Sequence, residues 1–388
     1  NNWNYIIYFL LIGFILVIIL KSRIYNSENL FFKNNLKNKF FKYNYVLTKF
    51  FEDMNNHYNW KILRNLSMDK RYLIDYANLK SELLLPQKRF SSYRDFLKIS
   101  KKKHGIPMLL PINDKHFNFN DLSNNFSLNE TDIANYIFLT KNTSYDPIKF
   151  LLKKGNKFSN NYKIKKNYIE IVDKIIQFNK VTQSLVKNCN KNKSLVAFQT
   201  RNIPHFGHEK IIEFLLTKFD VVAVNPIIGP KKRGDIKNSV LKYSWDYLIN
   251  NVYGDRLKFW PIISNMFYAG PNEALHHSIL RQNIGFKNFI VGRDHAGMSN
   301  FYKNNQAINF IKKHGRKLKI NVTTINGAFY SKSKKTVVVV KNFNQYRKDF
   351  VNISGTDFRK HLEKKQLFKR ANQNMQKKIH SKFDNLFQ

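Results

Sequence analysis

Leu195-Val-Ala-Phe-Gln-Thr-Arg-Asn-Ile-Pro-His-Phe-Gly-His208 joins a short apolar run to a polar cluster. The first four residues have the length and composition of a buried parallel strand. After His208 the apolar residues return at helical spacing, at positions 211, 212, 215 and 216. The polar cluster therefore occupies a strand-to-helix turn, which is where an open parallel sheet binds its ligands.

The side chains of this turn favour an anionic ligand. The cluster holds one arginine, two histidines and three neutral polar residues, namely Gln199, Thr200, Arg201, Asn202, His205 and His208. The helix that begins near His208 would direct its positive N-terminal end at the turn. Two loop histidines alone are often only surface residues, but the whole set suits a phosphate chain.

Strands and helices alternate after this turn. The apolar pattern predicts strands at 221–224, 257–261 and 289–291, and helices at 239–250 and 272–281. This order indicates right-handed βαβ units and a parallel sheet. The chain contains neither a GxGxxG fingerprint nor a Walker A loop.

Five segments resemble motifs of the ATP sulfurylase (sulfate adenylyltransferase) family, in that family's order. Residues 199–208 resemble QxRNPxHxGH, with Ile203 where proline is usual, and 292–297 give the complete GRDHAG. Residues 225–235 resemble HPLxGxxKxGD, with Asn225 for histidine and with Lys232 and Asp235 retained. Residues 266–274 resemble MRYAGPREA, with Phe267 and Asn272 replacing two arginines, and 353–359 match ISGTxxR.

The resemblance implies an α/β fold in three parts. A Rossmann-like nucleotidylyltransferase domain with a parallel sheet is expected at 193–335, a β-rich PUA-like domain at 72–192, and a small C-terminal α/β segment at 336–388. Within 72–192 we predict an extended segment at 105–112, similar to the family's GLPWPIP, a strand at 136–140, and helices at 146–153 and 168–178. Because the chain lacks a Walker A loop, it resembles the single-activity members of the family, which have no fused adenylylsulfate kinase.

The resemblance also implies the reaction, in which sulfate attacks ATP to give adenosine 5′-phosphosulfate and pyrophosphate. Gln199, Arg201 and the backbone N–H of Ala296 would then bind sulfate, and Thr200, Arg201 and Asn202 would be catalytic. His205 and His208 would face the departing pyrophosphate. The implied ATP-binding set is Gln199, Thr200, Arg201, Asn202, His205, His208, Gly292, Arg293, Asp294, His295 and Val337. No protein metal site is expected, because Mg²⁺ would arrive with ATP.

Two other functions are compatible with the same motifs. One is a catalytically retired homologue kept as a binding or assembly subunit, to which the high charge and the divergent N-terminal region point. The other is a nucleotidylyltransferase with a phosphorylated acceptor. The intact 199–202, HxGH and GRDHAG residues argue against both, and a homo-oligomer is compatible with all three functions.

The charge of the chain is extreme, with 67 Lys and Arg against 26 Asp and Glu, or +41. Nucleic-acid or membrane binding would give such an excess. The lysines, however, are spread through every segment and interleaved with Asn, which favours compositional drift over a dedicated nucleic-acid surface. The single cysteine, Cys189, excludes an intramolecular disulfide and argues against a cysteine-based zinc site.

The first residues of the chain predict a targeting segment. Residues 5–20 form an uncharged apolar run followed by Lys21 and Arg23, which is typical of a signal-peptide core or membrane anchor. We therefore divide the start of the chain into a hydrophobic segment at 1–24 and a basic leader or linker at 25–71. The expected location is a membrane, contacted through residues 5–20 if they are not cleaved, or an organelle.

Overall fold

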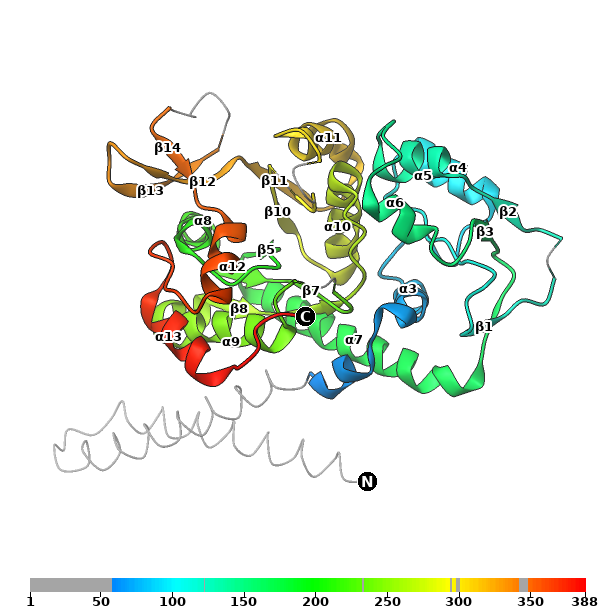
Figure 1. Ribbon diagram of the computed structural model, residues 1–388, viewed down its shortest axis with the longest axis horizontal. Helices are drawn as coiled ribbons and strands as arrows, with labels where there is room; N and C mark the ends of the chain where they lie inside the picture. The colour runs from blue at the N-terminus through cyan, green and yellow to red at the C-terminus, as the bar shows by residue number, and fades with distance from the viewer. Residues whose placement is uncertain (1–57, 122, 232–233, 294, 298–300, 342–347) are drawn as a thin grey trace, which may run out of the picture. The chain divides into compact units, whose positions relative to one another are not determined.

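A five-stranded parallel sheet forms the centre of the computed structural model (Figure 1). Its strands lie in the order β11 (Asn321–Ile325), β10 (Asn288–Gly292), β5 (Leu195–Phe198), β6 (Val221–Val224) and β8 (Leu257–Phe259), and every neighbouring pair is parallel. The structure describes residues 58–388 except 122, 232–233, 294, 298–300 and 342–347. The predicted parallel α/β sheet and its strands are confirmed.

The two faces of this sheet are covered by different helices. Alternate strand residues such as Val196, Val222 and Ile290 share one apolar cluster with α8 (Phe206–Leu216), α9 (Asn238–Leu248), α12 (Gly355–Glu363) and α13 (Gln373–Lys382). Helices α7 (Ile169–Asn192) and α10 (Gly270–Ile284) contact β5 and β10. Because side chains alternate across a strand, both faces are apolar and all four residues of β5 and of β6 are buried.

The helices predicted from apolar spacing are present, some with longer bounds and some with shorter ones. Helix α10 begins at Gly270 with Pro271 in its first turn and ends at Gly285, whose φ of 111° suits a glycine C-cap. Helix α7 runs well beyond the predicted 168–178. After β10 the chain forms α11 (Gln306–His314), which packs against α10.

The C-terminal part adds a small antiparallel sheet to this framework. Its strands lie in the order β13 (Thr336–Val340), β12 (Gly327–Ser331) and β14 (Phe350–Asn352). Both β12 and β13 contact α8, the helix that follows the polar turn. Helix α12 then follows Ser354, whose side chain accepts a hydrogen bond from Asp357 N and acts as the N-cap.

The region before α7 is mainly helical in the structure. It contains α3 (Arg71–Lys80), α4 (Tyr93–Lys102), α5 (Glu130–Ile133) and α6 (Asp146–Leu151). Its described strands are two residues each and form two antiparallel pairs, β1 (Phe117–Asn118) with β4 (Lys163–Ile164) and β2 (Phe126–Ser127) with β3 (Lys157–Phe158). A β-rich PUA-like domain is therefore not confirmed and stays a prediction.

The predicted strand at 136–140 is wrong. A capping box between Asn129 and Asp132 starts α5, and the chain continues as a π-helical turn over Ala134–Phe138. The turn ends at Leu139, which has a left-handed φ of 54°. The segment 105–112 has no helix, as predicted, and Pro111 forms an isolated antiparallel bridge with Phe158.

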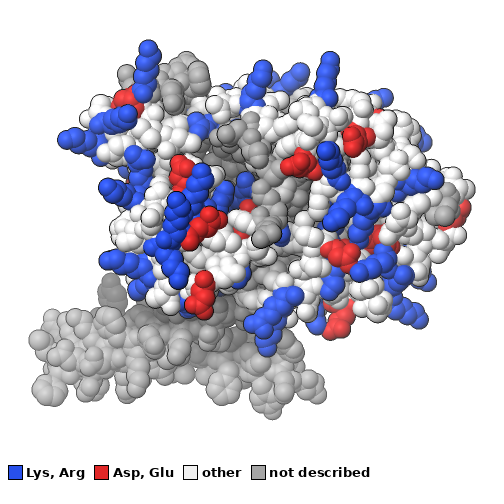
Figure 2. Space-filling model, in the orientation of Figure 1, with Lys and Arg blue, Asp and Glu red and all other residues white. Residues whose placement is uncertain are grey.

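The predicted membrane attachment is corrected by the structure. Over residues 58–388, apart from the undescribed gaps, none of the helices combines the length and the apolar character needed to cross a bilayer. The run at 5–20 itself lies outside the described residues. The positive charges are dispersed over the face seen in Figure 2, where Lys and Arg side chains cover many elements instead of forming one patch.

Candidate functional site

The polar turn lies where predicted, between β5 and α8 (Figure 1). His205 is the N-cap residue of α8, and its Nδ1 accepts hydrogen bonds from Gly207 N at 3.1 Å and His208 N at 3.3 Å. His208 Nδ1 accepts in return from His205 N at 3.4 Å. The two histidines thus form a reciprocal capping box of the kind usually made by Ser and Glu.

This capping box assigns the tautomer of each ring. A nitrogen that accepts a backbone N–H carries no proton, so the proton of each neutral ring lies on Nε2. The Nε2 of His208 lies 3.4 Å from Thr200 Oγ1. Both rings therefore present an N–H donor at the start of α8, where the first backbone N–H groups of the helix already have acceptors within the chain.

Burial keeps these two histidines neutral. It lowers the pKa of His205 to about 4 and the pKa of His208 well below its ordinary value, where the neighbouring His205 adds to the effect. The rings stack with centroids 3.8 Å apart and an interplanar angle of 19°. Two protonated rings at this distance would repel each other. They act as hydrogen-bond donors at neutral pH.

Arg201 extends from the turn toward two other loops. Its guanidinium carbon lies 5.4 Å from the centre of the Tyr268 ring, and its Nη2 donates to Gly297 O at 3.5 Å. Among the described residues, the buried Nη1 has no hydrogen-bond partner. Because an arginine nitrogen is rarely buried without an acceptor, this atom is available to bind an anionic ligand.

The remaining residues of the turn are held by specific contacts. Thr200 Oγ1 accepts from Asn202 N at 3.1 Å, and Asn202 Oδ1 accepts from Arg359 Nη1 at 2.7 Å. Gln199 Nε2 contacts Met266 Sδ at 4.0 Å, while its buried Oε1 has no hydrogen-bond partner in the part of the chain that the structure describes. The turn is thus fixed in shape, with polar atoms left for a ligand.

Three cations surround one carboxylate at this position. Burial lowers the pKa of Lys231 to about 8; Asp235 opposes this shift and Arg201 adds to it. Burial lowers the pKa of Arg359, and the positive charge of Arg201 lowers it further. Asp235 accepts a hydrogen bond from the Tyr268 hydroxyl at 3.2 Å. Arg201, Lys231 and Arg359 therefore create a local positive potential, which favours a multiply charged anion.

The GRDHAG residues lie at the end of β10, the neighbour of β5 in the sheet. A Cβ at Gly292 would meet no atom within 4 Å, and Arg293 Nη2 donates to Asn352 Oδ1 at 3.2 Å. Ala296 has a φ of 54°, which is uncommon for a residue with a side chain. Asp294 lies outside the described residues, as does Lys232.

Val337 lies in β13, opposite Tyr330 in the strand register. It is partly buried and packs against the apolar cluster that includes α8. Its adenine-binding role stays a prediction.

The donor set does not resemble a metal centre. The carboxylate of Asp235 at this site accepts a hydrogen bond from Tyr268. Searched over its described residues, the chain has no group of three or more His, Cys, Asp or Glu side chains placed to hold a metal ion. The site is built to bind anions.

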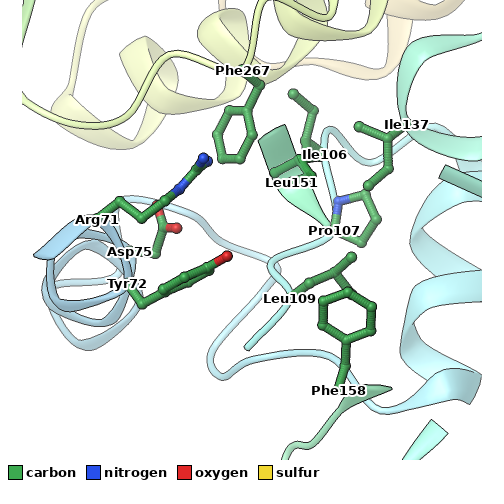
Figure 3. A pocket seen from close by; sticks show the side chains of 10 residues that line it. All are labelled: Arg71, Tyr72, Asp75, Ile106, Pro107, Leu109, Ile137, Leu151, Phe158 and Phe267. Atoms are coloured by element: carbon green, nitrogen blue, oxygen red, sulfur yellow. The ribbon is translucent and has the colours of Figure 1, made fainter. Parts of the chain in front are cut away.

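A separate cavity lies between α3 and the segment 106–109 (Figure 3). Its volume is about 10 Å³, which is room for about one water molecule. Arg71 points into a ring of aromatic side chains, with its guanidinium carbon 4.9 Å from the centre of Phe150 and 5.4 Å from that of Phe267. The cavity is too small for a nucleotide.

Three residues of the site were not predicted as site residues from the sequence, namely Lys231, Tyr268 and Arg359. Arg359 and Tyr268 lay inside recognised motifs, and Lys231 lay in the basic loop 230–233. Their places in or beside the motifs were the available signal, but only the folded chain brings them to Arg201.

Comparisons with known proteins point to one family. A sulfate adenylyltransferase of Pyrococcus abyssi is 41% identical over 168 residues, which cover 43% of this chain and 44% of that protein. One of Persephonella marina is 27% identical over 329 residues, covering 77% of this chain and 85% of that protein. A solved structure described as a hexameric APS kinase from Thiobacillus denitrificans has a TM-score of 0.52 at 10% identity, covers 81% of this chain and 62% of that one, and supports the fold alone.

The extent of these matches differs. The alignments span less than half of the Pyrococcus abyssi protein and of an Ignicoccus hospitalis sulfate adenylyltransferase, 44% of each. The family model for ATP-sulfurylase matches residues 176–371, which is half of the chain and includes all five motifs. This chain belongs to the ATP-sulfurylase family.

Proposed function

We propose that the protein is a sulfate adenylyltransferase, which joins ATP and sulfate to give adenosine 5′-phosphosulfate and pyrophosphate. The observation that carries this proposal concerns Arg201, in the turn before α8. Its buried Nη1 is available to a ligand, and it lies close to two other cations. Such a site attracts a tetrahedral dianion and a phosphate chain together. Family membership supports the same reaction.

The chemical step is one displacement at phosphorus. A sulfate oxygen forms a bond to the α-phosphorus of ATP, and the bond from that phosphorus to the pyrophosphate oxygen breaks. No protein nucleophile is needed. Because sulfate is a weak nucleophile and both reactants are anions, the protein must hold them in line and offset their repulsion.

Arg201 and Gln199 are the proposed sulfate ligands, together with the N–H of Ala296. A guanidinium presents two parallel N–H donors that match two oxygens of a tetrahedral anion. Thr200 and Asn202 would contact the α-phosphate beside Arg201. Arg359 acts through Asn202, because its 2.7 Å hydrogen bond orients that side chain.

His205 and His208 are the proposed donors to the departing pyrophosphate. Their neutral tautomers place N–H groups at the N-terminus of α8, where the helix dipole also favours negative charge. Donors aimed at the charge that develops in the transition state lower the barrier.

Gly292 to His295 would line the nucleotide, and the backbone of Val337 would contact the adenine. Mg²⁺ enters as part of the substrate MgATP, bound through the phosphates. The lack of a described carboxylate cluster at the site is compatible with this arrangement.

Three further assignments belong to this proposal. Residues 72–192 form a PUA-like domain, 193–335 the catalytic domain and 336–388 the C-terminal segment. The chain assembles into a homo-oligomer, a possibility supported by the hexameric description of a protein with a similar fold. Light scattering of the purified full chain tests this assembly.

A pyrophosphate-release assay tests the proposed function. The full chain is incubated with MgATP alone, with sulfate, or with a panel of phosphorylated acceptors. We expect release only with sulfate. Release that needs a phosphorylated acceptor would indicate a different nucleotidylyltransferase, and a folded protein that binds MgATP without releasing pyrophosphate would indicate a retired homologue.

A further inference from the structure

Glu273 is a fully buried carboxylate in the first turn of α10, with 0% of its surface exposed. Its Oε1 accepts a hydrogen bond from Phe267 N at 2.8 Å, and its Oε2 accepts one from Ala269 N at 2.9 Å. Burial raises the pKa of Glu273, and these two backbone donors oppose the shift. A carboxyl group is costly to bury, so its position calls for an explanation beyond packing.

The first consequence concerns Tyr268, which lies between the two donating residues. Tyr268 has a φ of 59°, a left-handed conformation that a bulky residue adopts only when its surroundings impose it. The two hydrogen bonds to Glu273 fix the peptide between residues 266 and 267 and the peptide between residues 268 and 269, so the chain is held shortly before and directly after Tyr268. The ring is thereby held 5.4 Å from the guanidinium carbon of Arg201.

The second consequence concerns the loop after β10. His277 lies one helical turn after Glu273, with its Nε2 3.3 Å from Glu273 Oε1, a close contact that lacks hydrogen-bond geometry. Its Nδ1 lies 2.8 Å from His295 Nε2. If the carboxylate attracts the Nε2 proton, His277 Nδ1 accepts the hydrogen bond from His295.

His295 directly precedes Ala296, the second residue with a left-handed φ at this site, 54°. Ala296 O also accepts from Gly270 N, at the start of α10, at 3.4 Å. The next carbonyl, that of Gly297, accepts from Arg201 Nη2 at 3.5 Å. Helix α10 therefore fixes this loop through the His277–His295 pair and through its own first N–H.

We propose that Glu273 is a positioning residue that fixes both protein surfaces around Arg201, one at Tyr268 directly and the other at Ala296–Gly297 through His277 and His295. This inference rests on the proposed function for its effect on turnover. The positioning itself is a property of the chain and is measurable without turnover.

The choice of a carboxylate follows from the two donors. A carboxylate has only acceptors, so it satisfies both backbone N–H groups at once. In Glu273→Gln one position carries an NH₂ group, which faces a backbone N–H donor. One of the two hydrogen bonds is then lost while the volume of the side chain is unchanged, and His277 loses the negative charge beside its Nε2.

A double-mutant cycle tests whether Glu273 acts through Arg201. We expect Glu273→Gln to lower kcat/KM for sulfate by about 10²-fold, the scale of a misplaced catalytic group. In an Arg201→Lys background the same change should cost less than about threefold, since coupled residues are not additive. Equal losses in both backgrounds would overturn the proposal.

A matched control separates positioning from damage to the core. Ser278→Ala changes another fully buried side chain of α10, whose hydroxyl donates only to Ala274 O within the same helix. We expect this variant to keep the wild-type kcat/KM. If Glu273→Gln does not fold, His277→Phe enters the cycle in its place, because it removes the connection from Glu273 to His295 and leaves both hydrogen bonds that Glu273 accepts from the backbone.

Hydrogen–deuterium exchange of the full chain provides a readout that does not depend on activity. Glu273→Gln should speed exchange in both segments 264–270 and 293–297, and His277→Phe should speed it in 293–297 alone. Unchanged exchange in 293–297 in both variants would overturn the proposal. If the wild type shows no sulfate-dependent turnover, the proposed function fails, while this exchange pattern still decides the positioning role.

Discussion

Replacing Arg201 by lysine keeps the charge and removes the geometry. In the structure the guanidinium uses Nη2 toward Gly297 O, faces the Tyr268 ring and leaves Nη1 for a ligand. An ammonium is a point charge with a shorter reach and cannot contact two oxygens in one plane. Lys231 and Arg359 remain, so the local positive potential is almost unchanged.

The expected loss follows from this comparison. The loss of one preorganised donor to a developing charge costs about 10² to 10³ in rate, or about 2.7–4 kcal/mol. We expect Arg201→Lys to lower kcat/KM for sulfate within this range. If Arg201 acted only through its charge, the ammonium would serve nearly as well.

The assay is sulfate-dependent pyrophosphate release at saturating MgATP, with circular dichroism to confirm that the variant is folded. Lys210→Arg is the matched control, because it exchanges lysine and arginine at a position away from the site. Lys210 is a residue of α8 that pairs with Glu213 on the surface. A loss of less than about threefold in Arg201→Lys, far below the range for a positioned donor, would refute the reasoning.

Three further predictions concern neighbouring residues. Arg359→Lys should lower kcat by about tenfold or more with little change in the free energy of unfolding, because Asn202 loses the 2.7 Å hydrogen bond that orients it; an unchanged kcat would contradict this role. His205→Asn should retain helix stability, since asparagine is a good N-cap, but lose at least about tenfold in kcat with the loss of the Nε2 donor; equal activity would show that the ring does not contact the leaving group. Burial lowers the pKa of His276 to about 4, so the folded state binds fewer protons than the unfolded state between pH 6.5 and 4, and stability falls as the pH falls through this range. Between pH 7 and 5 the wild type should therefore lose about 2 kcal/mol more than His276→Gln in urea unfolding, and parallel losses would contradict the neutral buried ring.

The core of the fold was predictable because its signals are local. The apolar run at Leu195–Phe198 and the helical spacing after it lie within one segment, and they correctly gave a strand, a turn and a helix. The segment 136–140 shows the limit of this reasoning. A short apolar run suits either a strand or a buried helix, and the capping box at Asn129 and Asp132 decided for a helix.

The composition of the site was less predictable. Motif resemblance identified the turn and the GRDHAG loop, but the contact between Arg359 and Asn202 joins residues 157 positions apart. The histidine capping box depends on the φ and ψ values of His205, which spacing does not reveal. The membrane prediction was based on the apolar run at 5–20 and the basic residues Lys21 and Arg23 after it, and among the described residues no helix is long and apolar enough to cross a bilayer.

The formation of a labelled product tests the central claim most directly. The full chain is incubated with MgATP and ³⁵S-labelled sulfate, with pyrophosphatase present to draw the reaction forward, and adenosine 5′-phosphosulfate is separated and counted against the phosphate released. Our account predicts labelled adenosine 5′-phosphosulfate in a one-to-one ratio with pyrophosphate. Pyrophosphate release without labelled product, or no product from a folded protein that binds MgATP, would contradict it.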